Sequence, residues 1–140
     1  MKSTDFSPIF WRSKRVLISG HTGFKGSWLS LWLQSMGADV CGVALAPPTE
    51  HSLFTEAKVA NGIRHEIVDI RNFDSVDFVF QSFRPEIVIH MAAQPLVRLS
   101  YKEPIETYAT NVMGTVHILE ASRRAKSVSA IVNVTTDKCY

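Results

Sequence analysis

A glycine-rich turn is the part of this 140-residue sequence whose residue types and spacing most directly suggest chemistry. Gly20, Gly23 and Gly26 recur at every third position, between the apolar run 16–19 and a tryptophan-rich apolar stretch. Glycines at this spacing let the backbone turn sharply, approach a pyrophosphate closely and pack a following helix against a sheet. The unpaired amide groups at the start of that helix would face the phosphates. The turn predicts a nucleotide-phosphate site, with a purely steric turn as the alternative.

Asp69 is a second candidate for binding a nucleotide, because it directly follows the apolar run 64–68. From this position its carboxylate is able to accept a hydrogen bond from the amino group of an adenine. The alternative is a structural role as the N-cap of the next helix. Both interpretations stay open, although the nearby glycine turn favours the adenine role.

Two further apolar runs are also followed by residues suited to a binding site. Ala92 and Ala93 come after the run 86–90 and would let a flat cofactor lie against the backbone, although small residues also serve packing. Thr136-Asp137-Lys138 comes after the run 129–134 and supplies a hydroxyl, a carboxylate and an amine. A solvated turn explains the same composition equally well.

The elements that position these residues alternate along the chain. We predict strands at 15–19, 38–44, 64–68, 86–90 and 129–134, and helices at 24–36, 53–61, 73–83 and 106–126. This alternation predicts a single α/β domain with a Rossmann-like, doubly wound parallel sheet of strand order 3-2-1-4-5. The strands are rich in Val and Ile with little alternation, so we expect them to be buried on both faces. Their carboxyl ends would bring the candidate residues to one edge.

The first predicted helix has a four-residue aromatic repeat. Phe24, Trp28, Trp32 and Met36 are expected to form its buried face, and Gly37 is expected to end it. Pro47-Pro48 and Pro95 fall beyond the ends of predicted strands, where proline marks loops.

Composition narrows the class of protein further. A hydrophobic content of 46% indicates a globular domain, and a net charge of +2 without a basic block argues against nucleic-acid binding. Cys41 and Cys139 show no metal-ligand spacing, and the five histidines include no pair at helical ligand spacing, so no metal is expected. We find no signal peptide or membrane-length apolar run, and we expect a reduced, cytoplasmic protein without membrane contact.

The combined motifs resemble those of the extended short-chain dehydrogenase/reductases, and within that superfamily the CDP-glucose 4,6-dehydratases. The resemblance covers residues 10–140. It is carried by the segments GHTGFKGSWL (20–29), AAQPLVR (92–98), TNVMGT (110–115) and TDKCY (136–140).

The resemblance implies NAD as cofactor and CDP-glucose as nucleotide-sugar substrate, converted to CDP-4-keto-6-deoxyglucose and water by oxidation at C4, elimination across C5 and C6, and reduction at C6. It assigns the pyrophosphate, the adenine and the nicotinamide half of NAD to three groups of residues. These are Gly20, Thr22, Gly23, Phe24, Lys25 and Gly26 for the pyrophosphate, Asp69 and Ile70 for the adenine, and Ala92, Ala93, Gln94 and Thr110 for the nicotinamide half.

The same resemblance assigns catalysis to Thr136, Asp137 and Lys138. Thr136 would orient a sugar hydroxyl, and Asp137 would protonate the hydroxyl that leaves C6. Lys138 stands where related dehydratases have a glutamate. It would act as the C5 base if its pKa were lowered, or as a charged group that stabilises the enolate.

Two departures from the pattern limit the resemblance. The residues after 38–44 include no acidic group for the adenosine ribose, with Glu50 further along, and no Tyr-x-x-x-Lys pair occurs. We therefore expect an incomplete NAD-binding domain that is inactive alone and acts, at full length, in a homodimer or higher homo-oligomer. A sugar-nucleotide 4-epimerase and a non-catalytic NAD(P)-binding module remain alternatives.

Overall fold

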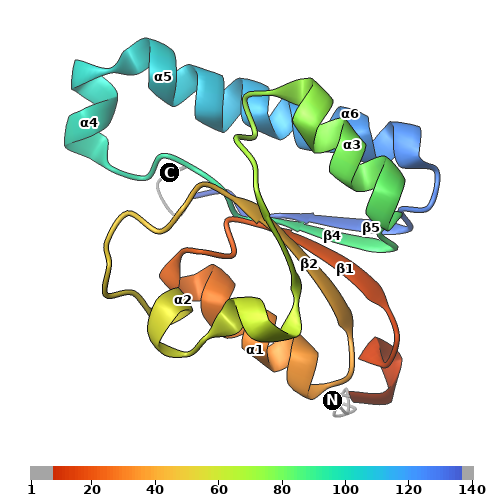
Figure 1. Ribbon diagram of the computed structural model, residues 1–140. Coiled ribbons are helices and arrows are strands. Elements are labelled where there is room, and N and C mark those ends of the chain that lie inside the picture. The colour runs from red at the N-terminus through yellow and green to blue at the C-terminus, as the bar shows by residue number, and fades with distance from the viewer. Residues whose placement is uncertain (1–7, 137–140) are drawn as a thin grey trace, which may run out of the picture.

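The computed structural model describes residues 8–136, which form a five-stranded parallel sheet with helices on both faces (Figure 1). The strands are β1 (Arg15–Ser19), β2 (Asp39–Ala44), β3 (Arg64–Ile67), β4 (Ile87–His90) and β5 (Ala130–Asn133). The α-helices are α1 (Phe24–Ser35), α2 (Leu53–Glu56), α3 (Phe73–Phe83), α4 (Val97–Lys102), α5 (Pro104–Tyr108) and α6 (Gly114–Ala125). Short 3-10 helices, η1 (Pro8–Trp11) and η2 (Val59–Gly62), and a π-helical segment, η3 (Ala109–Met113), complete the elements.

The sheet has the strand order β3-β2-β1-β4-β5, which confirms the predicted topology. Ser19 at the end of β1 is in register with Val43 on β2 and with His90 on β4. Strand order reverses at β1, so the polypeptide leaves β1 and β4 in opposite directions and opens a crevice between them. The glycine turn follows β1 and the Ala92-Ala93 segment follows β4, so both reach this crevice.

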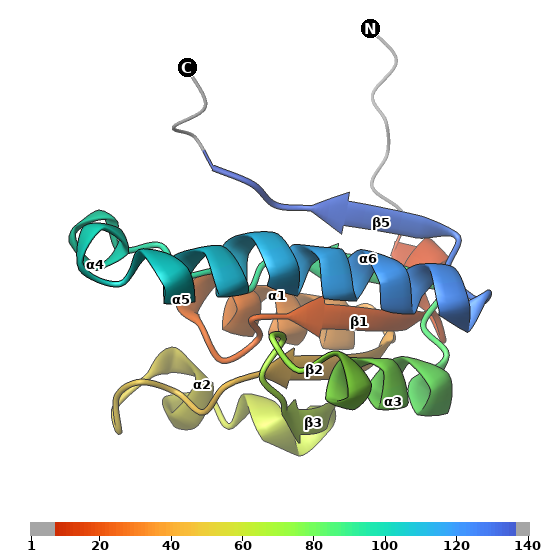
Figure 2. The same cartoon turned by 90° about the horizontal axis from the view of Figure 1, so that it is seen from above.

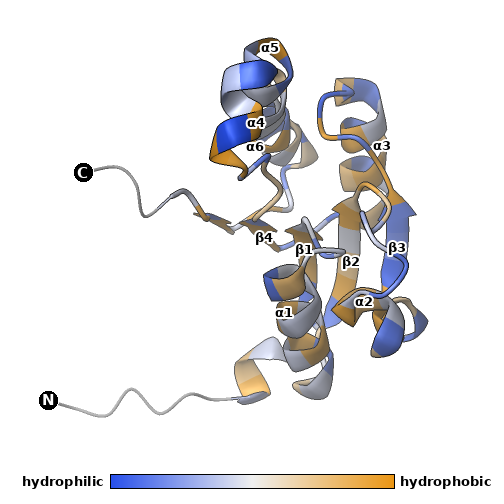
Figure 3. Cartoon of the chain, turned by 90° about the vertical axis from the view of Figure 1, so that its left-hand side faces the viewer, coloured by the Kyte–Doolittle hydropathy of each residue, from blue (hydrophilic) through white to orange (hydrophobic). Residues whose placement is uncertain are grey.

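Two helical layers cover the sheet. Helices α1 and α2 lie on one face, and α3, α5 and α6 lie on the other (Figures 2 and 3). The alternation of β1 separates two cores, because Val16 and Ile18 pack with Leu33 of α1 whereas Leu17 packs with Phe80 of α3. The sheet is therefore a rigid central layer from which the loops of the carboxyl edge project.

The prediction that the aromatic residues of α1 form its buried face is wrong. Phe24, Trp28 and Trp32 are 71%, 56% and 54% exposed, and only Met36 is buried. The face toward the sheet is formed instead by small or narrow side chains, namely Gly26, Ser27, Ser30 and Leu33. At Gly26 even a Cβ would clash with the Gly20 carbonyl oxygen, so no ring fits at that point of the face. The end of the helix is confirmed, since Gly37 has φ +80° and its amide bonds to the carbonyl of Gln34.

The prediction that every strand is buried on both faces is also wrong for the two edge strands, β3 and β5. β4 is buried, as are β1 and β2 after their first residues, whereas β3 is half-buried with an exposed last residue and every residue of β5 is exposed. β3 carries the polar sequence Arg-His-Glu-Ile and is mostly coloured hydrophilic in Figure 3. An edge strand lacks one lateral neighbour, so its side chains are covered less than those of a central strand.

The predicted helix at 106–126 is found as three consecutive helical segments, α5, η3 and α6, beginning at Pro104. Proline suits the first helical position because the amide there has no intrahelical partner. The π-helical turn of η3 was not predicted, because hydrophobic spacing does not register one extra residue in a turn. α4 was also missed, and only a short α2 and η2 lie in the region predicted as a helix at 53–61.

Candidate functional site

The three glycines of the turn have different environments. Gly20 has φ +83°, and a Cβ there would lie 2.9 Å from the backbone nitrogen of Ala92. A Cβ on Gly26 would clash with the carbonyl oxygen of Gly20, so the helix packs directly on the turn. Gly23 is exposed and would place a Cβ no closer than 3.4 Å to any neighbour. The first and third glycines are thus required by packing, while the surface over Gly23 is open to a ligand.

The start of α1 is suited to an anion. Gly23 is its N-cap and makes no side-chain capping bond, and no acidic residue occurs in the first turn. Lys25 lies in that turn and is exposed. The unpaired amides and the positive end of the helix dipole therefore face the open side of the turn, where a phosphate is favoured.

Thr22 and Ser27 fix the turn rather than face its open side. The Thr22 hydroxyl donates to the carbonyl of Leu45 after β2 at 2.9 Å, and Ser27 donates to the carbonyl of His21 at 3.0 Å. Both side chains are buried. Thr22, predicted as a cofactor contact, therefore has a clear structural role in tying the turn to β2.

His21 is completely buried beneath the turn. Its Nε2 hydrogen-bonds Nδ1 of His65 on β3 at 2.7 Å, its ring packs edge-on to Phe54, and Gly42 leaves the space that the ring fills. Burial, followed by the neighbouring His65, lowers the pKa of His21 to about 4. His21 is therefore neutral near pH 7, and its ring anchors the turn to the β2–β3 side of the sheet.

Asp69 is not the N-cap of α3, because Asn72 holds that position and accepts from the amide of Ser75 at 3.0 Å. The Asp69 carboxylate instead accepts from the backbone amide of Arg71 at 2.9 Å and from its Nη2 at 2.6 Å. These bonds hold the pKa of Asp69 below its usual value. The ionised, half-buried carboxylate remains a candidate acceptor for an adenine amino group. Ile70 beside it is buried, and its carbonyl accepts from His117.

A cleft of about 1010 Å³ opens at the carboxyl edge of β4 and β5. Its walls come from the first turn of α1, the segment after β4, the α5–α6 helix and the end of β5. The lining includes Lys25, His90, Ala92, Ala93, Gln94, Pro95, Leu96, Val97, Ser100, Thr107, Asn111, Thr115, Asn133, Val134, Thr135 and Thr136. Lys25 beside the glycine turn and the segments after β4 and β5, recognised separately in the sequence, therefore meet at one cavity.

A chain of hydrogen bonds lies at the base of the cleft. The Ser19 hydroxyl accepts from the amides of Met91 and Ala92 at 3.0 and 3.1 Å, so its proton points to Nδ1 of His90 at 2.5 Å. Nε2 of His90 then donates to Thr115 at 2.9 Å. Burial lowers the pKa of His90, which keeps the imidazole neutral in this single tautomer.

Asn111 connects the cleft walls. Its Oδ1 accepts from the backbone amide of Gln94 at 2.7 Å, and its Nδ2 donates to the carbonyl of Gln94 at 3.0 Å. Gln94 in turn donates from Nε2 to the hydroxyl of Thr107 at 3.1 Å. The π-helical turn carries Asn111, and such turns occur often at functional sites. The segment after β4 is therefore held in a fixed conformation against the helix.

The structure brings together three of the four residues predicted for the nicotinamide half. Ala92, Ala93 and Gln94 line the cleft, whereas Thr110 does not and its neighbour Asn111 does. Thr136, predicted as a catalytic residue, also lines the cleft. Asp137 and Lys138 lie outside the described residues, so their catalytic roles stay predictions. Phe24, predicted as a pyrophosphate contact, is exposed on α1.

Sequence reasoning missed several residues that shape the cleft, namely Ser19, His90, Thr107, Asn111 and Thr115. The four-residue spacing of Thr107, Asn111 and Thr115, which places these polar side chains on one side of the helix, was an available signal. Residues 8–136 contain no group of three His, Cys, Asp or Glu side chains that could hold a metal ion. In the same part of the chain, no helix has the length and apolar character needed to cross a membrane.

The sequence matches a family model described as GDP-mannose 4,6 dehydratase over residues 17–140. It is 58% identical over 131 residues to the CDP-glucose 4,6-dehydratase of Salmonella typhimurium, covering 94% of this chain and 36% of that protein. The chain therefore spans about a third of the length of this relative.

Solved structures show the same fold. The UDP-glucose 4-epimerase of Thermotoga maritima, solved with UDP-glucose, superposes with a TM-score of 0.78 at 26% identity, covering 87% of this chain and 38% of that one. The UDP-glucose 4-epimerase of Thermus thermophilus, solved in complex with NAD, has a TM-score of 0.70 at 31% identity, covering 81% of this chain and 35% of that one.

Proposed function

Because this chain belongs to the GDP-mannose 4,6 dehydratase family, we propose that it is the NAD-binding part of a CDP-glucose 4,6-dehydratase. The observation that carries the proposal is that the start of α1 is open over Gly23, while Lys25 of the same turn lines the cleft together with Gln94. The 58% identity to the Salmonella enzyme supports the choice of CDP-glucose.

The residues present fit a dinucleotide. The pyrophosphate would lie over Gly23 at the amides of α1, and Asp69 would accept the adenine amino group. The nicotinamide would lie in the cleft against Ala92 and Ala93. Thermus thermophilus UDP-glucose 4-epimerase was solved with NAD, which supports NAD as the cofactor. When bound, NAD supplies the hydride acceptor for oxidation at C4 of the sugar and the hydride donor for reduction at C6.

The residues of this chain would orient the substrate and move protons. Thr136 lies at the cleft and would hold a sugar hydroxyl. Asp137 would give a proton to the hydroxyl leaving C6, and Lys138 would remove the C5 proton or stabilise the resulting enolate. Elimination is feasible only after C4 is a ketone, because the ketone acidifies the proton on C5. A Tyr-x-x-x-Lys pair is absent from these 140 residues, so we propose that turnover requires a longer polypeptide.

Calorimetric titration of NAD into the 140-residue chain tests the cofactor site. We expect binding, and we expect Gly23→Ala to weaken it at least about tenfold because its methyl group occupies the phosphate surface. Circular dichroism checks that the variant stays folded. Unchanged NAD affinity in a folded Gly23→Ala variant would contradict the proposed site.

Mass spectrometry of the sugar nucleotide tests the reaction in a polypeptide extended to the length of the relatives. A dehydratase yields a product lighter by one water, and we expect Asp137→Asn and Lys138→Met to abolish this loss. A product that separates from the substrate by chromatography but has the same mass would favour a sugar-nucleotide 4-epimerase, a candidate supported by the likeness to the Thermotoga maritima structure. NAD binding without any product would favour a non-catalytic module.

A further inference from the structure

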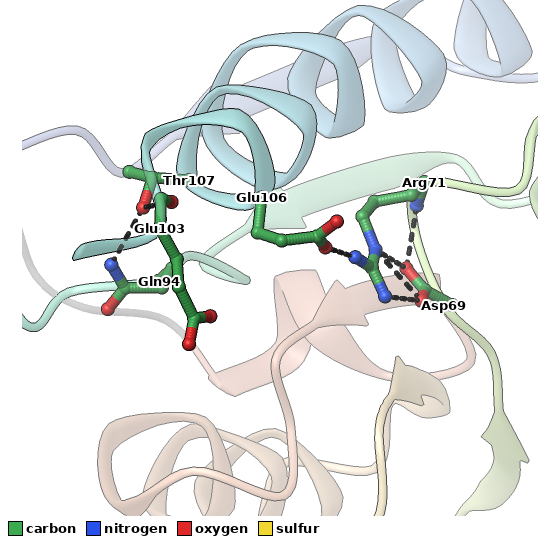
Figure 4. Close-up of polar contacts among 6 residues, drawn as sticks. All are labelled: Asp69, Arg71, Gln94, Glu103, Glu106 and Thr107. Atoms are coloured by element: carbon green, nitrogen blue, oxygen red, sulfur yellow. Dashed lines mark hydrogen bonds and ion pairs between the residues drawn. The ribbon is translucent and has the colours of Figure 1, made fainter. Parts of the chain in front are cut away.

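Arg71 connects two parts of the site that are far apart in the sequence. Its Nη2 donates to Oδ2 of Asp69 after β3, and its Nη1 donates to Oε2 of Glu106 on α5 (Figure 4). One guanidinium therefore bridges two carboxylates that come from different elements. The guanidinium presents its donors in a fixed planar fork, so while both bonds persist Asp69 and Glu106 are held at a set separation.

The Glu106 end of this bridge continues to the wall of the cleft. Thr107 follows Glu106 on α5 and accepts from Nε2 of Gln94 at 3.1 Å, and both Thr107 and Gln94 line the cleft. The hydroxyl of Thr107 also donates to the carbonyl of Glu103 at 2.9 Å, which holds it in the first turn of α5. The Gln94 side chain is also held by Leu96 of its own segment, whose amide donates to Oε1 at 2.6 Å and whose carbonyl accepts from Nε2 at 3.2 Å. The bond to Thr107 therefore joins α5 to a side chain that is already fixed at the cleft wall.

We propose that Arg71 is a positioning residue that couples the adenine end of the cofactor site to the nicotinamide end, through Asp69 on one side and Glu106 on the other. The inference rests on the proposed function, because it treats Asp69 and the cleft as two ends of one dinucleotide site. An adenine bonded to Asp69 would hold the carboxylate and, through Arg71, keep α5 against the cleft.

The charges on the bridge support this role. The pKa of Asp69 is lowered chiefly by its side-chain hydrogen bond with Arg71, and the pKa of Arg71 is raised by the same bond. Asp69 and Arg71 thus stay charged over the range in which the chain would bind a nucleotide. The side chains are 31%, 38% and 55% exposed for Asp69, Arg71 and Glu106, so the bridge is weaker than a buried ion pair and is able to open.

Glu106→Gln tests the coupling, because it removes the charge at the α5 end without touching Asp69. We expect NAD affinity to fall about three- to fivefold, the range expected for a partly exposed ion pair. ADP affinity should change less than about twofold, because ADP does not enter the cleft. Arg71→Lys should weaken both nucleotides, and adding Glu106→Gln to it should cause no further loss.

Glu103→Gln is the matched control, because it removes a carboxylate three residues earlier that is not joined to Arg71 in Figure 4. We expect it to leave both affinities unchanged. Amide hydrogen exchange adds a readout that needs no nucleotide: Glu106→Gln should speed exchange over residues 97–108, and Glu103→Gln should not.

The outcomes separate the two proposals. A wild-type chain that is folded but binds neither NAD nor ADP overturns the proposed function and this inference with it. Binding of both nucleotides with equal effects of Glu106→Gln on NAD and ADP, or with no effect on either, overturns the coupling alone. Exchange over residues 97–108 that is the same in Glu106→Gln and Glu103→Gln also overturns the coupling.

Discussion

Acidification should destabilise this protein through His21, the buried imidazole beneath the glycine turn. Its pKa is lowered from 6.5 to about 4 in the folded chain, so between these values the unfolded chain binds more protons. Stability attributable to His21 is therefore fully present above pH 6.5 and is lost as the pH falls toward 4. The full shift corresponds to about 3 kcal/mol, of which about 2 kcal/mol is lost between pH 7 and pH 5.

Urea unfolding followed by circular dichroism at pH 7, 6 and 5 measures this loss. A loss of about 2 kcal/mol lowers the urea midpoint by roughly 1 M for a chain of this size. The glutamine of His21→Gln stays in reach of His65 but does not titrate. The free energy of unfolding that this variant loses between pH 7 and pH 5 should therefore be smaller than the wild-type loss by about 2 kcal/mol. His90 remains in this variant, and burial lowers its pKa in the same direction, so some pH dependence should persist.

His51→Gln is the matched control, since the His51 side chain is 88% exposed. It should retain the pH dependence of the wild type. The reasoning would be refuted if His21→Gln and the wild type lost the same free energy of unfolding between pH 7 and pH 5. The burial of His21 would then make no contribution to the pH dependence of stability.

Two stability predictions concern the elements around the site. Gly26→Ala should destabilise the fold by about 2–3 kcal/mol, because its Cβ would clash with the Gly20 carbonyl oxygen. Gly23→Ala should cost less than about 1 kcal/mol, and equal midpoints for the two variants in urea unfolding would contradict the packing argument. Ser19→Ala should cost about 2–3 kcal/mol, because two amides and His90 lose their partner. Ser35→Ala, which removes one exposed hydroxyl, should cost under about 0.5 kcal/mol, and thermal melting compares the two.

Strand order and the edge that carries the site were predictable because both follow from local patterns. Strands alternate with helices along the chain, and the reversal at β1 then places the residues after β1 and β4 side by side. Ala92, Ala93 and Gln94 were assigned to this edge from the sequence and do line the cleft. In contrast, the bridge from Asp69 to α5 was not predictable, because Glu106 is 35 residues from Arg71 and reaches it only in the folded chain.

The aromatic repeat of α1 shows where pattern reasoning failed. Phe24, Trp28 and Trp32 have the spacing of a buried face, yet they are exposed, and the helix buries Gly26, Ser27, Ser30 and Leu33 instead, with Gly26 directly on the turn. Hydrophobic periodicity records which residues share a side of a helix. It does not record how much space separates that side from the sheet.

Residue order along the chain was enough to predict the α/β class and the glycine turn, because each depends on residues that are close together in the sequence. The strand order followed from the alternation of strands and helices, because parallel crossovers have one preferred hand. The identity of the side chains that meet at the site became known from the folded molecule. Ser19, His90 and Thr115 form one hydrogen-bonded chain, and Asp69, Arg71 and Glu106 form one bridge, because packing of the sheet and helices brings distant segments within hydrogen-bond reach. Such contacts act over a few ångströms in space, and sequence spacing carries no record of them.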